Sequence, residues 1–152
     1  MAADAEPYIL VDTNVLVYAY DRSELQKQRQ ALRVLNQLQQ TGSGALSTQV
    51  LGESFYALTR KIADPLSLEV ARERVERYLA SWPILSLTPW VVREAVRGAT
   101  EHRMNYYDAQ IWAVARINQL PIVLSEDFSD GSVIDGVRFT NPFAEGFDLD
   151  QL

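Results

Sequence analysis

The chain has 152 residues, of which 47% are hydrophobic, and this size and composition predict one domain with a substantial buried core. The absence of cysteine excludes disulfides and thiolate metal sites, and a single histidine provides too little imidazole for a zinc centre, so any bound metal needs oxygen ligands. The formal charge of −6 opposes sequence-independent binding to nucleic acid, although carboxylates that hold divalent cations would reverse the charge locally.

The first half of the chain predicts two strands, which are short apolar runs, and three helices with apolar residues at helical spacing. The strands are residues 8–12 and 45–47, and the helices cover residues 24–39, about 48–58 and about 67–79. The first strand is expected to be buried because its apolar residues are continuous and do not alternate with polar ones. Side chains of Ser47 or Thr48 and of Ser67 are expected to cap the second and third helices.

The second half continues the alternation of strands and helices. Strands are expected at residues 84–87, 122–124 and 137–140, and helices at residues 88–103 and 107–119. Strands separated by helices indicate an α/β fold with a mostly parallel central sheet and helices on both of its faces. In such sheets ligands bind beyond the carboxyl ends of the strands.

Four acidic residues lie where this fold would bring them to one pocket. Asp12 ends the first strand and Asp127 follows the fourth, while Asp108 lies in the first turn of its helix and Glu53 is near enough to its helix start to reach the same edge. Carboxylates held at the edge of a core repel one another and lose hydration unless a cation lies among them. The four acids therefore predict a divalent metal site with oxygen ligands.

Each acid taken alone also has a structural explanation. Asp108 can complement the helix dipole, Glu53 can be solvated helix surface, and Asp127 and Asp130 can be turn residues around Gly131. Asp12 is the hardest to explain in this way, because an aspartate is rarely left at the end of a buried strand without a partner and residues 1–21 contain no Lys or Arg.

The acidic segments resemble the successive motifs of PIN-domain ribonucleases, in order and over almost the whole chain. The resembling segments are residues 11–16, Glu53 with its apolar flanks, 107–111 and 124–128. The resemblance is closest to the toxin subunits of VapBC-type toxin–antitoxin pairs, whose C-terminal sequence is similar to residues 130–131, 137–138 and 141–143 here. One departure is Gly52, which stands where many relatives have asparagine before the glutamate.

This resemblance implies a single PIN-like nuclease domain over residues 1–152 that cleaves RNA with Mg²⁺, for which Mn²⁺ can substitute. It assigns Asp12, Glu53, Asp108 and Asp127 as catalytic residues and metal ligands. Asp130 is either a fifth acid of the cluster or a turn residue. Hydrolysis by water in a metal-assisted in-line displacement would leave 5′-phosphate and 3′-hydroxyl ends.

Supporting and substrate-binding residues are less specific in the sequence. Thr13, Asn14 and Ser125 are expected to support the acids, the two hydroxyls by orienting water or a substrate phosphate. Basic residues near the acids are candidates for RNA binding, with a solvated helix face as the alternative for each: Arg22, Lys27, Arg29, Arg33, His102 and Arg103. Tyr106 and Tyr107 are candidates for stacking on bases.

Two other classes of function stay open at this stage. One is a catalytically silent PIN-like module whose acids attract a cationic partner. The other is a haloacid-dehalogenase-like phosphatase, which usually has a second aspartate where Asn14 stands and a catalytic lysine that this chain does not show.

The resemblance also implies partners: an RNA substrate, a small antitoxin protein and a second copy of the chain in a homodimer. Apolar helix surfaces around residues 51–58 and near Trp82 and Trp90 are candidates for these contacts, although such residues more often form the core. No apolar run is long enough to cross a membrane and residues 1–7 lack an export signal, so we expect a cytoplasmic protein in which residues 1–6 are disordered.

Overall fold

The computed structural model describes residues 6–152. The expectation of disorder for residues 1–6 therefore falls outside the described residues except for Glu6, which is exposed and belongs to no helix or strand. Within the described part of the chain, no helix combines the length and hydropathy needed to cross a membrane.

The described residues form one α/β domain with a mostly parallel, six-stranded sheet. Its strands are β1 (Ile9–Val11), β2 (Gly44–Ser47), β3 (Ile84–Leu85), β4 (Ile122–Leu124), β5 (Val133–Ile134) and β6 (Val137–Thr140). Its helices are α1 (Thr13–Tyr18), α2 (Leu25–Thr41), α3 (Thr48–Arg60), α4 (Leu68–Ser81), α5 (Pro89–Glu101) and α6 (Tyr106–Ile117), with a 3₁₀ turn, η2 (Leu149–Gln151), near the C-terminus.

The strand order β3-β2-β1-β4-β6-β5 places β1 in the middle of the sheet, between β2 and β4. All pairs are parallel except β5 with β6. Val11 is in register with Leu124, so the residues that follow β1 and β4 emerge side by side at the carboxyl edge of the sheet. This is the edge at which parallel α/β sheets bind ligands.

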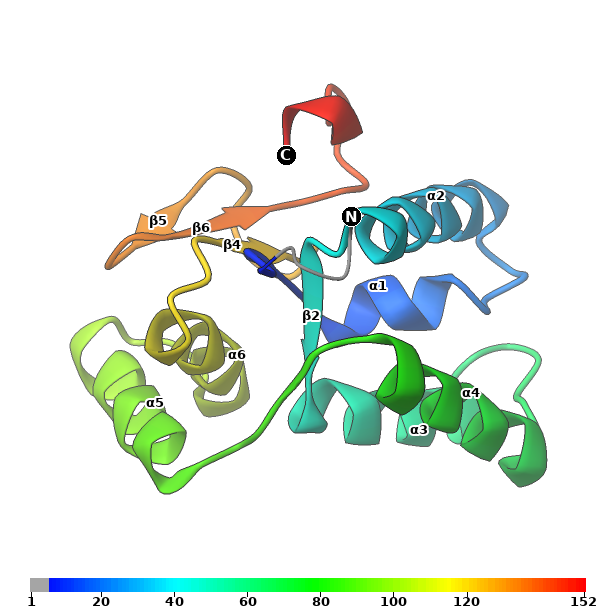
Figure 1. Ribbon diagram of the computed structural model, residues 1–152, viewed down its shortest axis with the longest axis horizontal. Coiled ribbons are helices and arrows are strands. Elements are labelled where there is room, and N and C mark those ends of the chain that lie inside the picture. The colour runs from blue at the N-terminus through cyan, green and yellow to red at the C-terminus, as the bar shows by residue number, and fades with distance from the viewer. Residues whose placement is uncertain (1–5) are drawn as a thin grey trace.

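Helices cover both faces of the sheet, as the alternating pattern predicts. The chain runs outward in the sheet from β1 to β2 to β3 and then returns past β1 to β4. Because right-handed crossovers that run in opposite directions lie on opposite faces, α5 and α6, which connect β3 to β4, lie on the face opposite to α2 and α3. Figure 1 shows α5 and α6 on one side of the strands and α1 to α4 on the other.

The core lies between the sheet and its helices. The strands β1 and β2 are fully buried, and residues 109–115 of α6 are buried on all sides. Trp112 is the largest fully buried side chain, and its indole N–H donates to the Ile134 carbonyl at 3.1 Å, so the buried polar group is satisfied. The position of α6, and with it Asp108 in its first turn, is therefore set by core packing.

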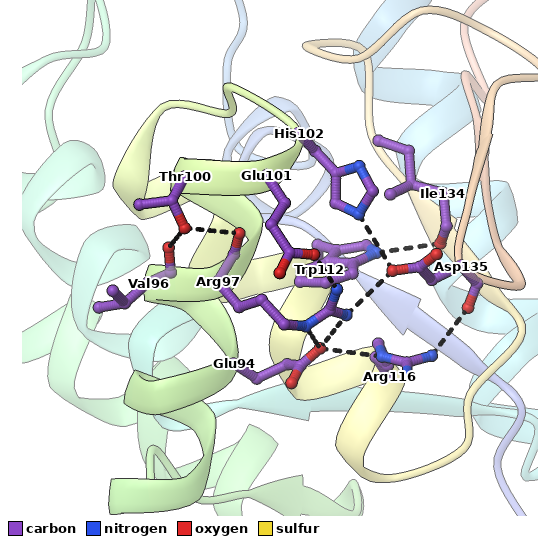
Figure 2. A network of polar contacts seen from close by, with 10 residues as sticks. All are labelled: Glu94, Val96, Arg97, Thr100, Glu101, His102, Trp112, Arg116, Ile134 and Asp135. Atoms are coloured by element: carbon purple, nitrogen blue, oxygen red, sulfur yellow. Dashed lines mark hydrogen bonds and ion pairs between the residues drawn. The ribbon is translucent and has the colours of Figure 1, made fainter.

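A network of ion pairs fixes α5 and α6 to the turn between β5 and β6. Arg97 bonds to Glu94, Glu101 and Asp135, and Arg116 donates to Glu94 at 2.9 Å and to the Asp135 carbonyl at 3.1 Å. Figure 2 shows Arg97 at the centre of these contacts. The guanidinium groups hold the pKa of Glu94 below its usual value, chiefly through the bond from Arg97.

The structure differs from the sequence-based expectation mainly in short elements. The six-residue helix α1 was not predicted; the Asp12 side chain caps it by accepting the Thr13 N–H at 2.7 Å. Strand β5 was also not predicted, although Asp135-Gly136, with φ of 45° and 83°, is a favoured two-residue hairpin turn. Strand β3 is shorter than expected, Ile84–Leu85, and α5 ends at Glu101, two residues before the predicted end.

Candidate functional site

The four acids predicted to act together line one cavity. They come from four places in the fold: the ends of β1 and β4, the middle of α3 and the first turn of α6. The cavity has a volume of about 610 Å³, and its wall includes Asp12, Glu53, Asp108 and Asp127. The geometry expected from the parallel sheet is therefore present.

Asp12 is the buried member of the group, with 5% of its surface exposed. Its carboxylate accepts hydrogen bonds from the Ser125 hydroxyl at 2.7 Å and from the Thr13 N–H at 2.7 Å. Burial nevertheless outweighs these donors and raises the pKa of Asp12 from 3.8 to about 6, with further contributions from the charges of Asp127 and Glu53. Among residues 6–152 no cationic side chain contributes to this pKa, so the described part of the protein does not compensate the charge of Asp12.

Ser125 and Asn14 connect Asp12 to Asp127. Ser125 is 1% exposed, and its hydroxyl oxygen accepts from the Asn14 amide at 3.0 Å and from the Asp127 N–H at 3.1 Å. The Asn14 amide also donates to the Asp127 carboxylate at 3.1 Å, and its carbonyl oxygen accepts the Glu126 N–H at 3.3 Å. The two polar residues fix the loop after β4 against the start of α1, so they position Asp127 relative to Asp12.

Glu53 is held by one residue of α1 and one residue of its own helix, α3. One carboxylate oxygen accepts from the Thr13 hydroxyl at 2.8 Å and the other from the Gln49 amide at 2.8 Å. Gln49 in turn accepts from the Gln110 amide at 2.7 Å and donates to the Tyr107 carbonyl at 3.3 Å. Gln110 is 5% exposed, so a buried amide of α6 sets the orientation of the α3 side chain that holds Glu53.

Asp108 is the least constrained of the four acids. Its carboxylate makes no side-chain hydrogen bond within residues 6–152, whereas Asp12, Glu53 and Asp127 each accept at least one. Desolvation, followed by the charges of Asp127 and Glu53, raises the pKa of Asp108. The carboxylates of Asp127 and Glu53 therefore repel that of Asp108 as well as that of Asp12.

The cavity offers only oxygen donors to a cation, which suits Mg²⁺ or Mn²⁺. Over residues 6–152, however, no three Asp, Glu, His or Cys side chains are already placed as a metal site. Three of the acids have oxygens engaged by hydroxyl and amide donors, and the carboxylate of Asp108 has no such donor within the same residues. The donor chemistry of the cavity fits a hard divalent cation.

Several predicted residues lie outside the cavity wall. Asp130 accepts the Asn141 N–H at 2.9 Å, so it connects the loop after β4 to the residue that follows β6. Lys27 pairs with Glu126 at 2.9 Å, and His102 pairs with Asp135 at 3.0 Å in the network of Figure 2. The remaining basic candidates are exposed at other positions on the surface: Arg22, Arg29, Arg33 and Arg103.

Three residues near the acids were not singled out from the sequence: Gln49, Lys61 and Gln110. Gln49, Glu53 and Ala57 form one row of α3 at four-residue spacing, Lys61 continues the row at the C-cap of the helix, and all four line the cavity. That spacing was a readable signal once Glu53 had been assigned to the site. Gln110 had no such signal, because its burial follows from the packing of α6.

The apolar helix surfaces considered for partner binding are mostly core. Leu58 and Trp82 are buried, and Leu51 is buried at the base of a groove between α3 and α4 that Phe55 and Leu68 also line. Trp90, by contrast, is 61% exposed at the start of α5. Trp90, Tyr56 and the outer parts of this groove are therefore accessible to a partner.

Comparisons with known proteins agree with this architecture. The model of the PIN domain family matches residues 9–129. A search of curated proteins returns no match to the chain.

Solved structures with the same fold include several toxin–antitoxin assemblies. A DNA-bound VapBC complex from Salmonella typhimurium has a TM-score of 0.67 at 17% identity, covering 90% of this chain and 99% of that one. A toxin–antitoxin complex from Klebsiella pneumoniae has a TM-score of 0.63 at 20% identity, covering 89% and 98%. VapC20 of Mycobacterium tuberculosis, a toxin that cleaves the sarcin-ricin loop, has a TM-score of 0.59 at 20% identity, covering 86% and 98%. With the match of the family model over most of its length, the chain belongs to the PIN domain family.

Proposed function

We propose that this protein is a metal-dependent endoribonuclease that hydrolyses RNA phosphodiesters to 5′-phosphate and 3′-hydroxyl ends. The observation that carries the proposal is the convergence of Asp12, Glu53, Asp108 and Asp127 on one open cavity at the carboxyl edge of the sheet. Such a cavity needs a cation to relieve the repulsion among its carboxylates, and an anionic substrate needs the same cation to enter.

The four acids are the proposed ligands of Mg²⁺, with Mn²⁺ as a substitute. A bound divalent cation would supply charge stabilisation for the phosphate and an acidified water as nucleophile. Because the pKa values of Asp12 and Asp108 are raised, a bound cation would compete with protons for these two carboxylates and would lower both pKa values.

Three neighbouring residues have supporting roles in this proposal. Ser125 and Asn14 fix the spacing of Asp12 and Asp127 through the hydrogen bonds that join them. Thr13 donates to Glu53 and holds that carboxylate toward α1. These residues keep the acids aligned while water is directed at the phosphorus in line with the leaving 3′-oxygen.

We further propose that the protein is the toxin of a toxin–antitoxin pair. Its fold is shared with toxin subunits in complexes from Klebsiella pneumoniae and Salmonella typhimurium, and the groove between α3 and α4 offers apolar surface to a small protein.

A homodimer is the proposed state of the isolated chain. A catalytically silent module is the alternative, and turnover distinguishes it from a nuclease. Membership of the PIN family removes the phosphatase alternative.

The proposal is tested by incubating purified protein with total bacterial RNA in Mg²⁺ and sequencing the new 5′ ends. A nuclease produces reproducible 5′-phosphate ends that disappear in chelator and with Asp108→Asn. A protein that binds Mg²⁺ but produces no new ends is the silent module.

A further inference from the structure

The acidic cavity extends well beyond the four carboxylates, as a groove between two helices. One wall is the row of α3 that contains Gln49, Glu53 and Ala57 and ends at the C-cap Lys61, and the opposite wall is α1 with the turn after it. Lys61 is eight positions after Glu53, so the groove continues for about 12 Å along the helix at 1.5 Å per residue. This is more length than a single phosphate requires.

Lys61 has a distinct place in this groove. The wall contains five acidic residues, Asp12, Asp21, Glu53, Asp108 and Asp127, and one basic residue, Lys61. Its side chain is exposed, and in the part of the chain that the structure describes it forms no ion pair. By contrast, Lys27 is engaged with Glu126 and Tyr18. The ammonium group of Lys61 lies over the Tyr56 ring and has no anionic partner among residues 6–152, so it can bind an anion without breaking an ion pair.

The floor of the groove between Lys61 and the acids is largely apolar and is formed by small side chains. Ala57 on α3 and Val17 on α1 line it, and both are half-buried. Asp21, the remaining acid near this end, is satisfied locally, because it accepts from the N–H of Ser23 at 3.0 Å and from its hydroxyl at 2.6 Å. A sugar or base can lie over the small Ala57 side chain without burying an unpaired charge.

Resting on the nuclease function proposed above, we infer that the α1–α3 groove receives the RNA strand beside the scissile phosphate and that Lys61 binds a neighbouring phosphate there. Lys61 is then a substrate-binding residue, remote from the reacting atoms. An ammonium on a flexible stem contacts the backbone as a point charge, so it contributes affinity and register without reading sequence.

Arg60 provides a matched control for Lys61. The two cations are neighbours in sequence and both lie over the Tyr56 ring, with distances to its centroid of 5.7 Å for Arg60 and 5.4 Å for Lys61. Arg60 does not line the groove. Arg60→Gln and Lys61→Gln therefore remove the same charge from adjacent positions, and only the second removes it from the proposed RNA path.

The experiment measures binding of a short fluorescein-labelled single-stranded RNA of randomised sequence to full-length protein that also carries Asp12→Asn, in Mg²⁺. Lys61→Gln should weaken binding by roughly fivefold to tenfold and reduce the slope of log affinity against log salt by about 0.7, the value for one phosphate contact on a single strand. In protein that retains Asp12 and cleaves RNA, Lys61→Gln should raise KM for the RNA and leave kcat within about twofold. Ala57→Leu, which fills the floor between Lys61 and the acids, should weaken binding as well.

Equal effects of Lys61→Gln and Arg60→Gln in a protein that cleaves RNA would overturn the assignment of the groove and leave the nuclease function intact. Wild-type protein that neither binds nor cleaves RNA would overturn the nuclease function itself. Unchanged RNA binding with weaker capture of a co-expressed neighbouring small protein would assign Lys61 to the protein partner. Melting temperatures of the variants within a few degrees of wild type confirm that each comparison is made on folded protein.

Discussion

At the scale of single residues, the site is a set of carboxylates whose charges are poorly compensated by the protein. Asp12 is buried among apolar strand residues and Asp108 makes no side-chain hydrogen bond within residues 6–152, yet both face other acids across the cavity. Such an arrangement costs folding free energy, and a protein retains it where a cationic ligand recovers that cost. Two predictions concern this balance.

The first prediction is that Asp12→Asn stabilises the protein in chelator at neutral pH. The folded-state pKa of Asp12 is about 6 and its ordinary value is 3.8, so the folded protein holds this proton to a higher pH than the unfolded chain does. Its contribution to stability is complete below about pH 4, is lost as the pH rises to about 6 and stays lost above that. The variant should therefore become more stable than wild type through this window, by about 3 kcal/mol at pH 7.

Urea denaturation from pH 4 to pH 8 in chelator measures this difference. A variant that is much less stable than wild type at pH 7 would show that protein donors satisfy the Asp12 charge, which is the structural explanation of this residue.

The second prediction concerns Ser125, whose hydroxyl lowers the pKa of Asp12 by donating to it. Ser125→Ala should raise that pKa further and destabilise the fold by about 1–2 kcal/mol, because two donors, the Asn14 amide and the Asp127 N–H, lose an acceptor. Ser125→Thr keeps the hydroxyl and is the control. Carboxyl NMR titration of Asp12 together with urea denaturation would reveal the effect, and identical results for the alanine and threonine variants would refute it.

At the scale of elements, regular spacing in the sequence predicted most of the fold, and packing decided the rest. The longer helices and the parallel strands carry enough apolar residues to be recognised, and the acids at the ends of β1 and β4 follow from them. Helix α1 is too short for a periodic pattern, and it forms because Asp12 caps it and Val15 and Leu16 are buried. Lys61, at the C-cap of α3, is related to the site only by its spacing from Glu53, which becomes informative once Glu53 is assigned to the site.

The third prediction tests the close contact of α5 with α6. A Cβ added at Gly98 would meet the Trp112 ring at 2.7 Å, so Gly98→Ala should destabilise the fold by about 1–3 kcal/mol. Gly52→Ala is the matched control, because it lies in the interior of α3 with nothing within 4 Å, and it should stabilise by about 0.5–1 kcal/mol. Chemical denaturation of both variants provides the measurement, and a neutral Gly98→Ala would mean that the two helices are less closely packed than the structure shows.

At the scale of the whole molecule, a chain with a net charge of −6 is proposed to act on a polyanion. The charge is distributed so that this is feasible: five acids line the groove where cations would bind, and Lys61 lies at its far end. The basic residues Arg97 and Arg116 are instead committed to the network that fixes α5 and α6. The acidic composition is therefore compatible with RNA as a substrate only when divalent cations are bound.

The fourth prediction is that the isolated chain is a homodimer that also binds a small protein encoded beside it. Light scattering after gel filtration should give twice the mass of one chain, and co-expression with the neighbouring gene should give a complex that elutes earlier and has little nuclease activity. Leu68→Glu, in the groove between α3 and α4, should release the small protein, whereas Arg33→Glu on the surface of α2 should not. A monomer that ignores its neighbour would contradict the toxin–antitoxin assignment.

The most direct test of the central claim is the sequencing of RNA 5′ ends after incubation with wild-type protein and with Asp108→Asn, each in Mg²⁺ and in chelator. The account predicts reproducible new 5′-phosphate ends from wild type in Mg²⁺ alone, and a loss of at least about a hundredfold in the variant, because a metal ligand has been removed. Ends that persist in chelator, or that Asp108→Asn produces as well as wild type, would contradict the assignment of the acidic cavity as a metal-dependent nuclease site.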